Sequence, residues 1–314
     1  MLLSKDLLFG FKIGLLSFIA ILIWQMIIRL KKFFISPRAK EFLTMSTHTE
    51  KKIVPSMGGI AFFLLLPLIL WEDNFSSRSI IISLSAGLFG LLGAIDDISK
   101  IKRGRGISIR SKLFFGFWVA LIPSLYFLFA FPQSSYIDFF FFTIDLQYFF
   151  ILWLMWVMTA TVHAVNLVDG IDGLAITQVW LVSFFSIFLT KTTFVFRYTN
   201  YLFIQFFLQN MPPAKIFMGD VGAFFLVVLL ASQFLVAKTE LLLPFSGIIF
   251  VANTVICLIQ ITSFKWFKKR IFTFTPFHHA LELKGWSEKK INIAYSTITI
   301  IMNLFLMLIF YLFK

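Results

Sequence analysis

The sequence has little charge and almost no cysteine. Asp, Glu, Lys and Arg make up 14% of its 314 residues, whereas 59% of the residues are hydrophobic. So few charged side chains cannot cover the surface of a water-soluble protein of this length, which excludes a soluble globular fold. The single cysteine, Cys257, excludes a disulfide framework and a cysteine-based metal site.

The sequence also lacks a polar stretch long enough for a separate soluble domain. Apolar runs recur almost from end to end, and about 20 such residues in a helix cross the hydrocarbon core of a lipid bilayer. We therefore expect an all-α polytopic membrane protein with one domain over residues 1–314. Ten transmembrane spans are predicted, near 7–28, 57–71, 79–95, 113–131, 147–164, 173–190, 193–210, 221–237, 242–264 and 291–313.

The first apolar run, 7–28, is too long for the core of a signal peptide. Arg29, Lys31 and Lys32 follow it without a small-residue cleavage site. We expect it to be a retained membrane span.

Positive charge alternates between the predicted loops. The loops after spans one, three and nine are rich in Lys and Arg, whereas residues 71–74 and 131–138, after spans two and four, have none. By the positive-inside rule, the loops after odd-numbered spans face the cytoplasm and both termini lie outside. This topology, together with anionic lipid or substrate phosphates, explains the net charge of +13 without a nucleic-acid partner.

Five carboxylates stand at the edges of apolar runs, where a charge is costly unless it meets water, a cation or a partner. They are Asp96, Asp97, Asp169, Asp172 and Asp220. Helix capping would explain any one of them alone. Because they occur in the loops after spans three, five and seven, which share the predicted cytoplasmic face, they can converge on one site.

The spacing of these acids suggests different tasks. Asn166, Asp169 and Asp172 are separated by three residues and would share one face of a helical turn. Adjacent Asp96 and Asp97 would point about 100° apart on a helix, so that one can act on substrate while the other holds a metal or a lysine.

The residue types favour a hard metal and phosphate. Carboxylates without cysteine select Mg²⁺ or Mn²⁺, whose natural ligand here would be a diphosphate. A cationic set suited to phosphate oxygens accompanies the acids, although the positive-inside rule accounts for each member singly. Its members are Lys52, Lys100, Arg110, Lys112 and Lys215.

Five segments together resemble the signature motifs of the polyprenyl-phosphate N-acetylhexosamine-1-phosphate transferase family, in the same order and over nearly the whole chain. They are PSMGG at 55–59, DDISK at 96–100, HAVNLVDGIDGLA at 163–175, KIFMGDVG at 215–222 and PFHH at 276–279. The region from 270 to 288 is more similar to the branch that acts on muramoyl-pentapeptide donors than to the N-acetylglucosamine branch.

The resemblance implies an Mg²⁺-dependent enzyme, with Mn²⁺ as a substitute, in the bacterial inner (cytoplasmic) membrane, its active site facing the cytoplasm. Its substrates would be a UDP-activated amino sugar and undecaprenyl phosphate in the lipid bilayer, and UMP would be released. The muramoyl-pentapeptide donor would yield lipid I for peptidoglycan; the alternative donor, UDP-N-acetylglucosamine, would serve cell-surface polysaccharide synthesis. A homodimer is compatible with this family.

The resemblance also assigns roles to residues at the motif positions. Asp220, with Asp169 and Asp172, would hold the metal, while Asp96 would deprotonate the lipid phosphate with support from Asp97. The remaining implied roles are uracil stacking by Phe217, nucleotide binding by Asn166, neutralisation of phosphate charge by Lys52 and Lys100, and a lining of the sugar or diphosphate end by catalytic His278 and by His279.

Two departures from the family pattern affect substrate positioning. Ala280 interrupts a run of three histidines, and Ala223 stands where a serine commonly follows the metal-site motif. A transporter and a non-catalytic scaffold are the alternatives from other classes. A transporter would more often show inverted repeats and broken helices near the bilayer midplane, and a scaffold would not need the acids.

The predicted topology can be tested by labelling single cysteines in intact cells. Cysteines introduced at Asn74 and Ser134 should react with a membrane-impermeant reagent, whereas those at Ser46, Gly104 and Glu288 should be protected. Reaction at Gly104 without reaction at Ser134 would reverse the assignment.

Overall fold

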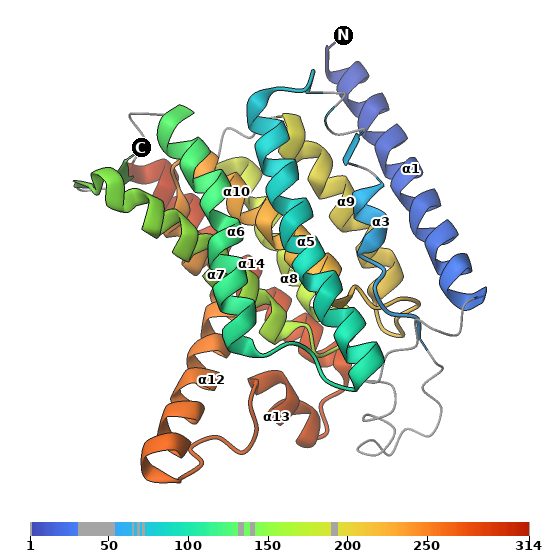
Figure 1. Ribbon diagram of the computed structural model, residues 1–314, viewed down its shortest axis with the longest axis vertical. Coiled ribbons are helices and arrows are strands. Elements are labelled where there is room, and N and C mark those ends of the chain that lie inside the picture. Colours follow the sequence, from blue (N-terminus) through green and yellow to red (C-terminus); the bar gives the residue numbers. More distant parts are fainter. Residues whose placement is uncertain are drawn as a thin grey trace.

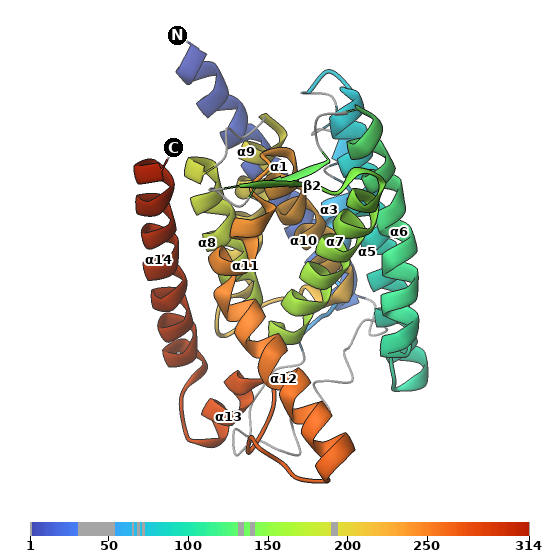
Figure 2. The same ribbon diagram turned by 90° about the vertical axis from the view of Figure 1, so that its left-hand side faces the viewer.

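A computed structural model describes residues 2–30, 54–64, 66–67, 70, 73–130, 135–138, 142–189 and 194–313. Long helices pack side by side, some of them inclined to the others, with the two chain ends toward the same end of the bundle (Figures 1 and 2). The long helices are α1 (Leu2–Leu30), α5 (Ser77–Arg103), α6 (Ile109–Ala130), α7 (Phe150–Val168), α8 (Leu174–Leu189), α9 (Phe194–Asn210), α10 (Gly219–Val236), α12 (Ile248–Phe267) and α14 (Glu288–Phe313).

Shorter elements connect these helices. The helical ones are α3 (Ile60–Phe63), η3 (Gln147–Phe149), η4 (Glu240–Leu242), α11 (Leu243–Ser246) and α13 (Phe277–Leu283). Strands β1 (Tyr136–Asp138) and β2 (Thr143–Asp145) form an antiparallel hairpin in which Tyr136 pairs with Asp145. The all-α prediction did not include this hairpin.

Among the described residues, six helices are long and apolar enough to cross a membrane. They are 77–103, 109–129, 147–168, 219–236, 248–267 and 288–312, while residues 14–26 within α1 and helix α8 are shorter apolar stretches. The prediction of a multi-pass membrane protein is therefore confirmed. The count of ten stays a prediction, because only 60–63 forms an unbroken helix among the described residues of span 57–71. The side on which the termini lie also stays a prediction.

Two predicted boundaries were wrong. Helix α5 continues to Arg103 instead of ending at 95, because the basic side chains belong to its last turn and Gly104 ends it with φ +70°. The predicted span 242–264 is interrupted at Gly247, where α11 ends and α12 begins. Hydropathy misses both features because it registers neither cap geometry nor a local break in an apolar run.

Helix α10 forms the centre of the bundle. Its residues from 220 to 235 are all buried, in contact with α5, α7 and α8. Gln233 within it is paired with neighbours: the hydroxyls of Ser183 and Ser186 donate to Gln233 Oε1 at 3.0 and 2.7 Å. Such pairing is needed where no water can replace a missing hydrogen bond.

Glycines let α5 and the segment around 59 approach α10 closely. A Cβ at Gly93 would overlap with the backbone of Asp220, and a Cβ at Gly59 would overlap with the backbone of Gly222. Small residues permit such approach of membrane helices. The contact at Gly93 places the end of α5 beside the start of α10.

Replacing Gly93 by Ala should push α5 and α10 apart, at a cost of about 1–3 kcal/mol in stability. The matched control is Gly87→Ala on the same helix, where the nearest side-chain atoms lie 3.9 Å from an added Cβ; it should be neutral or stabilise by up to ~1 kcal/mol. Thermal unfolding in detergent measures both. Equal unfolding temperatures for the two variants would contradict the close contact.

Candidate active site

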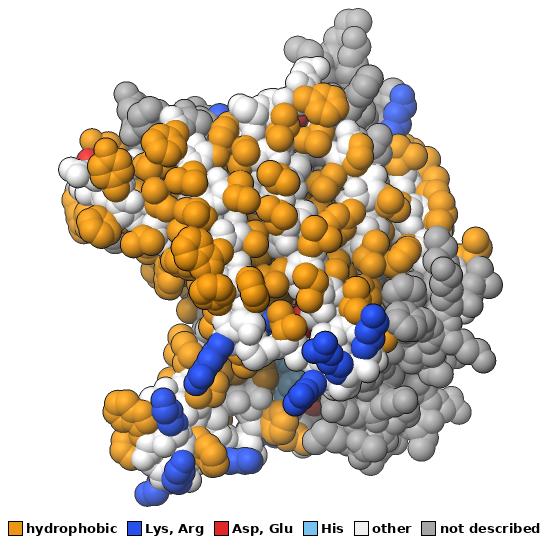
Figure 3. Space-filling view, viewed as in Figure 1, with side chains coloured by type: hydrophobic (Ala, Val, Ile, Leu, Met, Phe, Trp, Pro, Cys, Tyr) orange, Lys and Arg blue, Asp and Glu red, His pale blue; other side chains and the backbone are white. Residues whose placement is uncertain are grey.

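The motif segments meet at the end of the bundle where α5 finishes, α10 starts and α13 lies (Figure 1). Lys and Arg side chains gather at the same end of the face seen in Figure 3. The opposite part of that face is covered largely by hydrophobic side chains. This distribution is typical of a membrane protein with one charged, water-facing end.

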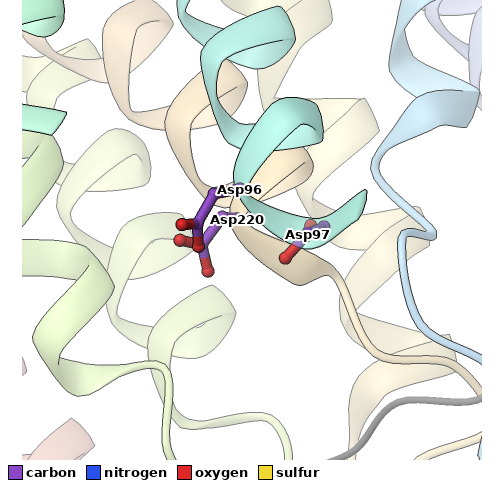
Figure 4. A group of neighbouring side chains, drawn as sticks. All are labelled: Asp96, Asp97 and Asp220. Carbon is purple, nitrogen blue, oxygen red and sulfur yellow. The ribbon is translucent and has the colours of Figure 1, made fainter. Parts of the chain in front are cut away.

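Three carboxylates lie together at this end. Asp96 and Asp97 come from α5 and Asp220 from the first turn of α10 (Figure 4). One oxygen of each lies within 4.8 Å of the others, and the residues are only 0%, 5% and 1% exposed. Three buried negative charges at this separation would repel one another strongly without cations.

Two lysine ammonium groups supply the positive charge. Lys100 Nζ lies 2.6 Å from Asp96 Oδ2, 2.6 Å from Asp220 Oδ1 and 3.3 Å from Asp97 Oδ1. Lys112 Nζ, from the first turn of α6, lies 2.7 Å from Asp96 Oδ2 and 2.8 Å from Asp220 Oδ2. The three acids and two lysines form a single ion-pair network, which we call the acid–lysine cluster.

The loop between α5 and α6 closes over Asp96. The backbone N–H of Ile107 donates to Asp96 Oδ1 at 2.7 Å, and any side chain at Gly106 would overlap with that carboxylate. Asp96 thus accepts bonds at both oxygens and is fully buried. The glycine is needed here for close backbone approach.

Asp97 serves a different neighbour. Its Oδ2 accepts from the backbone N–H of Val221 at 3.1 Å, so that a side chain of α5 satisfies a free donor in the first turn of α10. The expected divergence of Asp96 and Asp97 is confirmed. Capping, the alternative considered for such acids, accounts for one oxygen of Asp97 and leaves the rest of the cluster unexplained.

The segment after α7 is a turn. Helix α7 ends at Val168, Asp169 has the non-helical ψ of 55°, and Gly173 adopts φ +76°. The prediction that Asn166, Asp169 and Asp172 share a helical face was therefore wrong, because the helix ends before the two acids. Asp172 Oδ2 instead accepts from the backbone N–H of Ala214 at 3.0 Å.

Asn210, at the end of α9, joins this turn to the segment before α10. Its Oδ1 accepts from Gly173 N–H at 3.2 Å, and its Nδ2 donates to the carbonyl of Ile216 at 2.8 Å. Sequence analysis missed Asn210, whose one signal was a polar residue ending an apolar run. The next residue of that segment, Phe217, is half-buried and exchanges backbone hydrogen bonds of 2.8 and 2.9 Å with Pro55 and Gly58.

His278 and His279 lie on α13 against the turn after α7. A Cβ at Gly170 would come within 2.6 Å of His278 Nε2 and 2.8 Å of His279 Nε2. His278 is fully buried, and neither of its ring nitrogens has a hydrogen-bond partner among the described residues. Burial, with the neighbouring His279, lowers the pKa of His278 to about 3. His279 Nδ1 lies 2.6 Å from Glu282 Oε2.

Several other predicted site residues lie outside the acid–lysine cluster. Asn166 is half-buried, with an unpaired Oδ1, and Arg110 and Lys215 of the cationic set are exposed. Lys52 lies outside the described residues. Lys112, named only within the cationic set, proves to be part of the acid–lysine cluster.

The donor atoms of the cluster suit a hard divalent cation. Within the described part of the chain, the group able to hold a metal consists of Asp96, Asp97 and Asp220, all oxygen ligands. Asp169 and Asp172 belong to the neighbouring turn, and their roles as metal ligands stay predictions.

The fold and the site together define a class of protein. It is a multi-pass helical membrane protein with a buried acid–lysine cluster at its basic end. The model of glycosyl transferase family 4 matches residues 79–238, which contain all three acids of the cluster. The chain belongs to this family.

Several relatives carry one name, phospho-N-acetylmuramoyl-pentapeptide-transferase. The relative from Kosmotoga olearia is 35% identical, over 82% of this chain and 84% of the relative. That from Dictyoglomus thermophilum is 35% identical over 78% and 80%. That from Wolbachia sp. subsp. Drosophila simulans is 37% identical over 81% and 84%. The family expected from the motifs is therefore confirmed.

The buried state of His278 predicts how stability depends on pH. Its pKa is about 3 in the folded chain against about 6.5 unfolded, so between these values the unfolded state binds more protons. Stability should fall by about 2 kcal/mol between pH 6.5 and pH 5. Thermal unfolding at pH 7.5 and pH 5 should therefore differ more for wild type than for His278→Gln. An equal loss in the two proteins would contradict the buried neutral imidazole.

Proposed function

We propose that the chain transfers phospho-N-acetylmuramoyl-pentapeptide from its UDP derivative to undecaprenyl phosphate, forming lipid I and releasing UMP. The observation that carries this proposal is the acid–lysine cluster, whose three acids and Lys100 come from the DDISK and KIFMGDVG motif segments. The shared name of the relatives supports the choice of substrates. The reaction belongs to the first membrane-bound stage of peptidoglycan synthesis.

The reaction joins two anions. An oxygen of the lipid phosphate forms a bond to the phosphorus attached to the sugar, and the bond from that phosphorus to UMP breaks. Repulsion between the two phosphates opposes their approach. Fixed cations lower this repulsion, and they lower the barrier most when they lie beside the oxygens on which negative charge develops in the transition state. Lys100 and Lys112 are the cations held closest to the acids.

Asp220, Asp96 and Asp97 would hold Mg²⁺ or Mn²⁺, since they bring oxygen donors to one point. The metal would supply charge neutralisation on the diphosphate. The side chains of the acid–lysine cluster and its neighbouring segments would then position the two phosphates beside the metal and exclude water from them. Asp96 would have two tasks, holding the metal through one oxygen and accepting the proton of the lipid phosphate through the other. Because it is fully buried with both oxygens bonded, the second task requires that one of these contacts be released.

The neighbouring segments would bind the donor. Phe217 would stack on uracil, Asn166 would bind the nucleotide with Asp169 and Asp172, and Lys52 would neutralise phosphate. His278 and His279 would face the sugar or diphosphate end, which fits the unpaired, neutral ring of His278. The site would open to the cytoplasm from a single domain in the bacterial inner membrane.

One observation favours a second donor. Ala280 is 93% buried beside His278 and His279 on α13, so a methyl group that can neither donate a hydrogen bond nor carry charge stands where the family usually offers an imidazole. If the protein binds the peptide arm of the donor less tightly for this reason, UDP-N-acetylglucosamine would compete with the muramoyl-pentapeptide donor for the site.

A side-by-side assay of the two donors tests the proposal. With purified protein, Mg²⁺ and undecaprenyl phosphate, UDP-N-acetylmuramoyl-pentapeptide should support UMP release about tenfold better or more, a difference of ~1.4 kcal/mol in transition-state binding. Uridine and diphosphate are common to both donors, so the preference must come from contacts to the lactyl-peptide arm. Equal turnover, or preference for UDP-N-acetylglucosamine, would refute the peptidoglycan assignment and leave the family assignment intact.

A further inference from the structure

We propose that Lys100 is an exchangeable internal cation, which occupies the carboxylate oxygens of the cluster until a divalent metal replaces it. The inference rests on the proposed function, because it assumes that the three acids bind the metal. It adds a competition between the chain's own ammonium group and the metal.

The oxygens that a metal would need are already occupied. Asp220 contacts Lys100 through Oδ1 at 2.6 Å and Lys112 through Oδ2 at 2.8 Å. Asp96 contacts both lysines through Oδ2 and accepts from Ile107 through Oδ1. A divalent cation binds carboxylate oxygens at about 2.1 Å, and a second cation 2.6–2.8 Å from the same atom would be strongly repelled.

Lys100 is the lysine able to leave. Of the two lysines in the cluster, it is the one that touches all three acids, so its ammonium group stands at the position that a shared metal would take. Its side chain is 26% exposed, whereas that of Lys112 is 11% exposed, and Lys112 Nζ also lies 6.0 Å from the ring centre of Phe224. A lysine on a flexible four-carbon stem near the surface can turn outward once a metal takes over the pairing of the acids.

The exchange has a consequence for the reaction. With Lys100 in place the cluster carries three negative and two positive charges, so the apo site is nearly neutralised and does not need a metal to remain folded. When the ammonium leaves, it stays within one side-chain length of the acids. A phosphate drawn to the metal would then meet this same cation.

Metal binding without turnover tests the inference. Full-length protein in detergent, without either substrate, is titrated with MnCl₂ while free Mn²⁺ is followed by its solution EPR signal. Lys100→Met should bind Mn²⁺ about tenfold more tightly than wild type, because a competing positive charge is gone. The matched control is Lys102→Met, two residues further along α5 with an exposed side chain, which should bind like wild type.

The outcomes separate this inference from the proposed function. Binding that depends on Asp220, shown by its loss in Asp220→Asn, but is unchanged or weaker in Lys100→Met would overturn the exchange and leave the metal site standing. Binding that Asp220→Asn does not alter, or no binding by either wild type or Lys100→Met, would overturn both. Should Lys100→Met fail to fold, Lys100→Gln replaces it, since its amide can still donate to a carboxylate.

Discussion

The neutralisation of three buried carboxylates by two lysines is the interaction on which the rest of the site depends. Leaving a buried charge without its partner costs about 3–5 kcal/mol, so neither the acids nor the lysines can be placed independently. The cluster joins α5, α6 and α10 through Lys100 and Lys112. Its charges therefore connect the three helices that carry these residues of the candidate site.

The surrounding backbone is arranged to make this pairing possible. Gly93 lets α5 meet the start of α10, and Gly106 lets the following loop cover Asp96. Asn210 then connects the turn after α7 to the segment that leads into Asp220. Hydrophobic side chains cover most of the face seen in Figure 3, and the basic side chains gather at one end of it. Under the proposed function, a water-soluble donor and a lipid acceptor would meet at that end.

Much of this arrangement could be predicted from the sequence. Apolar runs predicted the long helices, and the occurrence of acids in loops on one predicted face brought Asp96, Asp97 and Asp220 together. The period of an α-helix also gave the different directions of Asp96 and Asp97. These inferences succeed because hydrophobicity and helical geometry are local properties of the chain.

Other features depend on contacts between distant segments and were missed. The end of α7 before Asp169 follows from the turn that Gly173 permits, and no regular spacing reveals it. The bridging position of Lys112 arises only when the first turn of α6 comes within reach of Asp220 at the start of α10. In the sequence alone, a lysine in a loop between apolar runs is interpreted as a topology signal. Asn210 lacks a motif because it acts through backbone groups of other segments.

The central claim is that phosphate exchange occurs at the acid–lysine cluster. The most direct measurement is the exchange of labelled UMP into UDP-N-acetylmuramoyl-pentapeptide by the purified protein. The account predicts exchange that requires both undecaprenyl phosphate and a divalent cation, stops on chelation, and falls by about 100-fold or more in Asp220→Asn. Undiminished exchange by Asp220→Asn would place the chemistry elsewhere in the molecule and contradict the account.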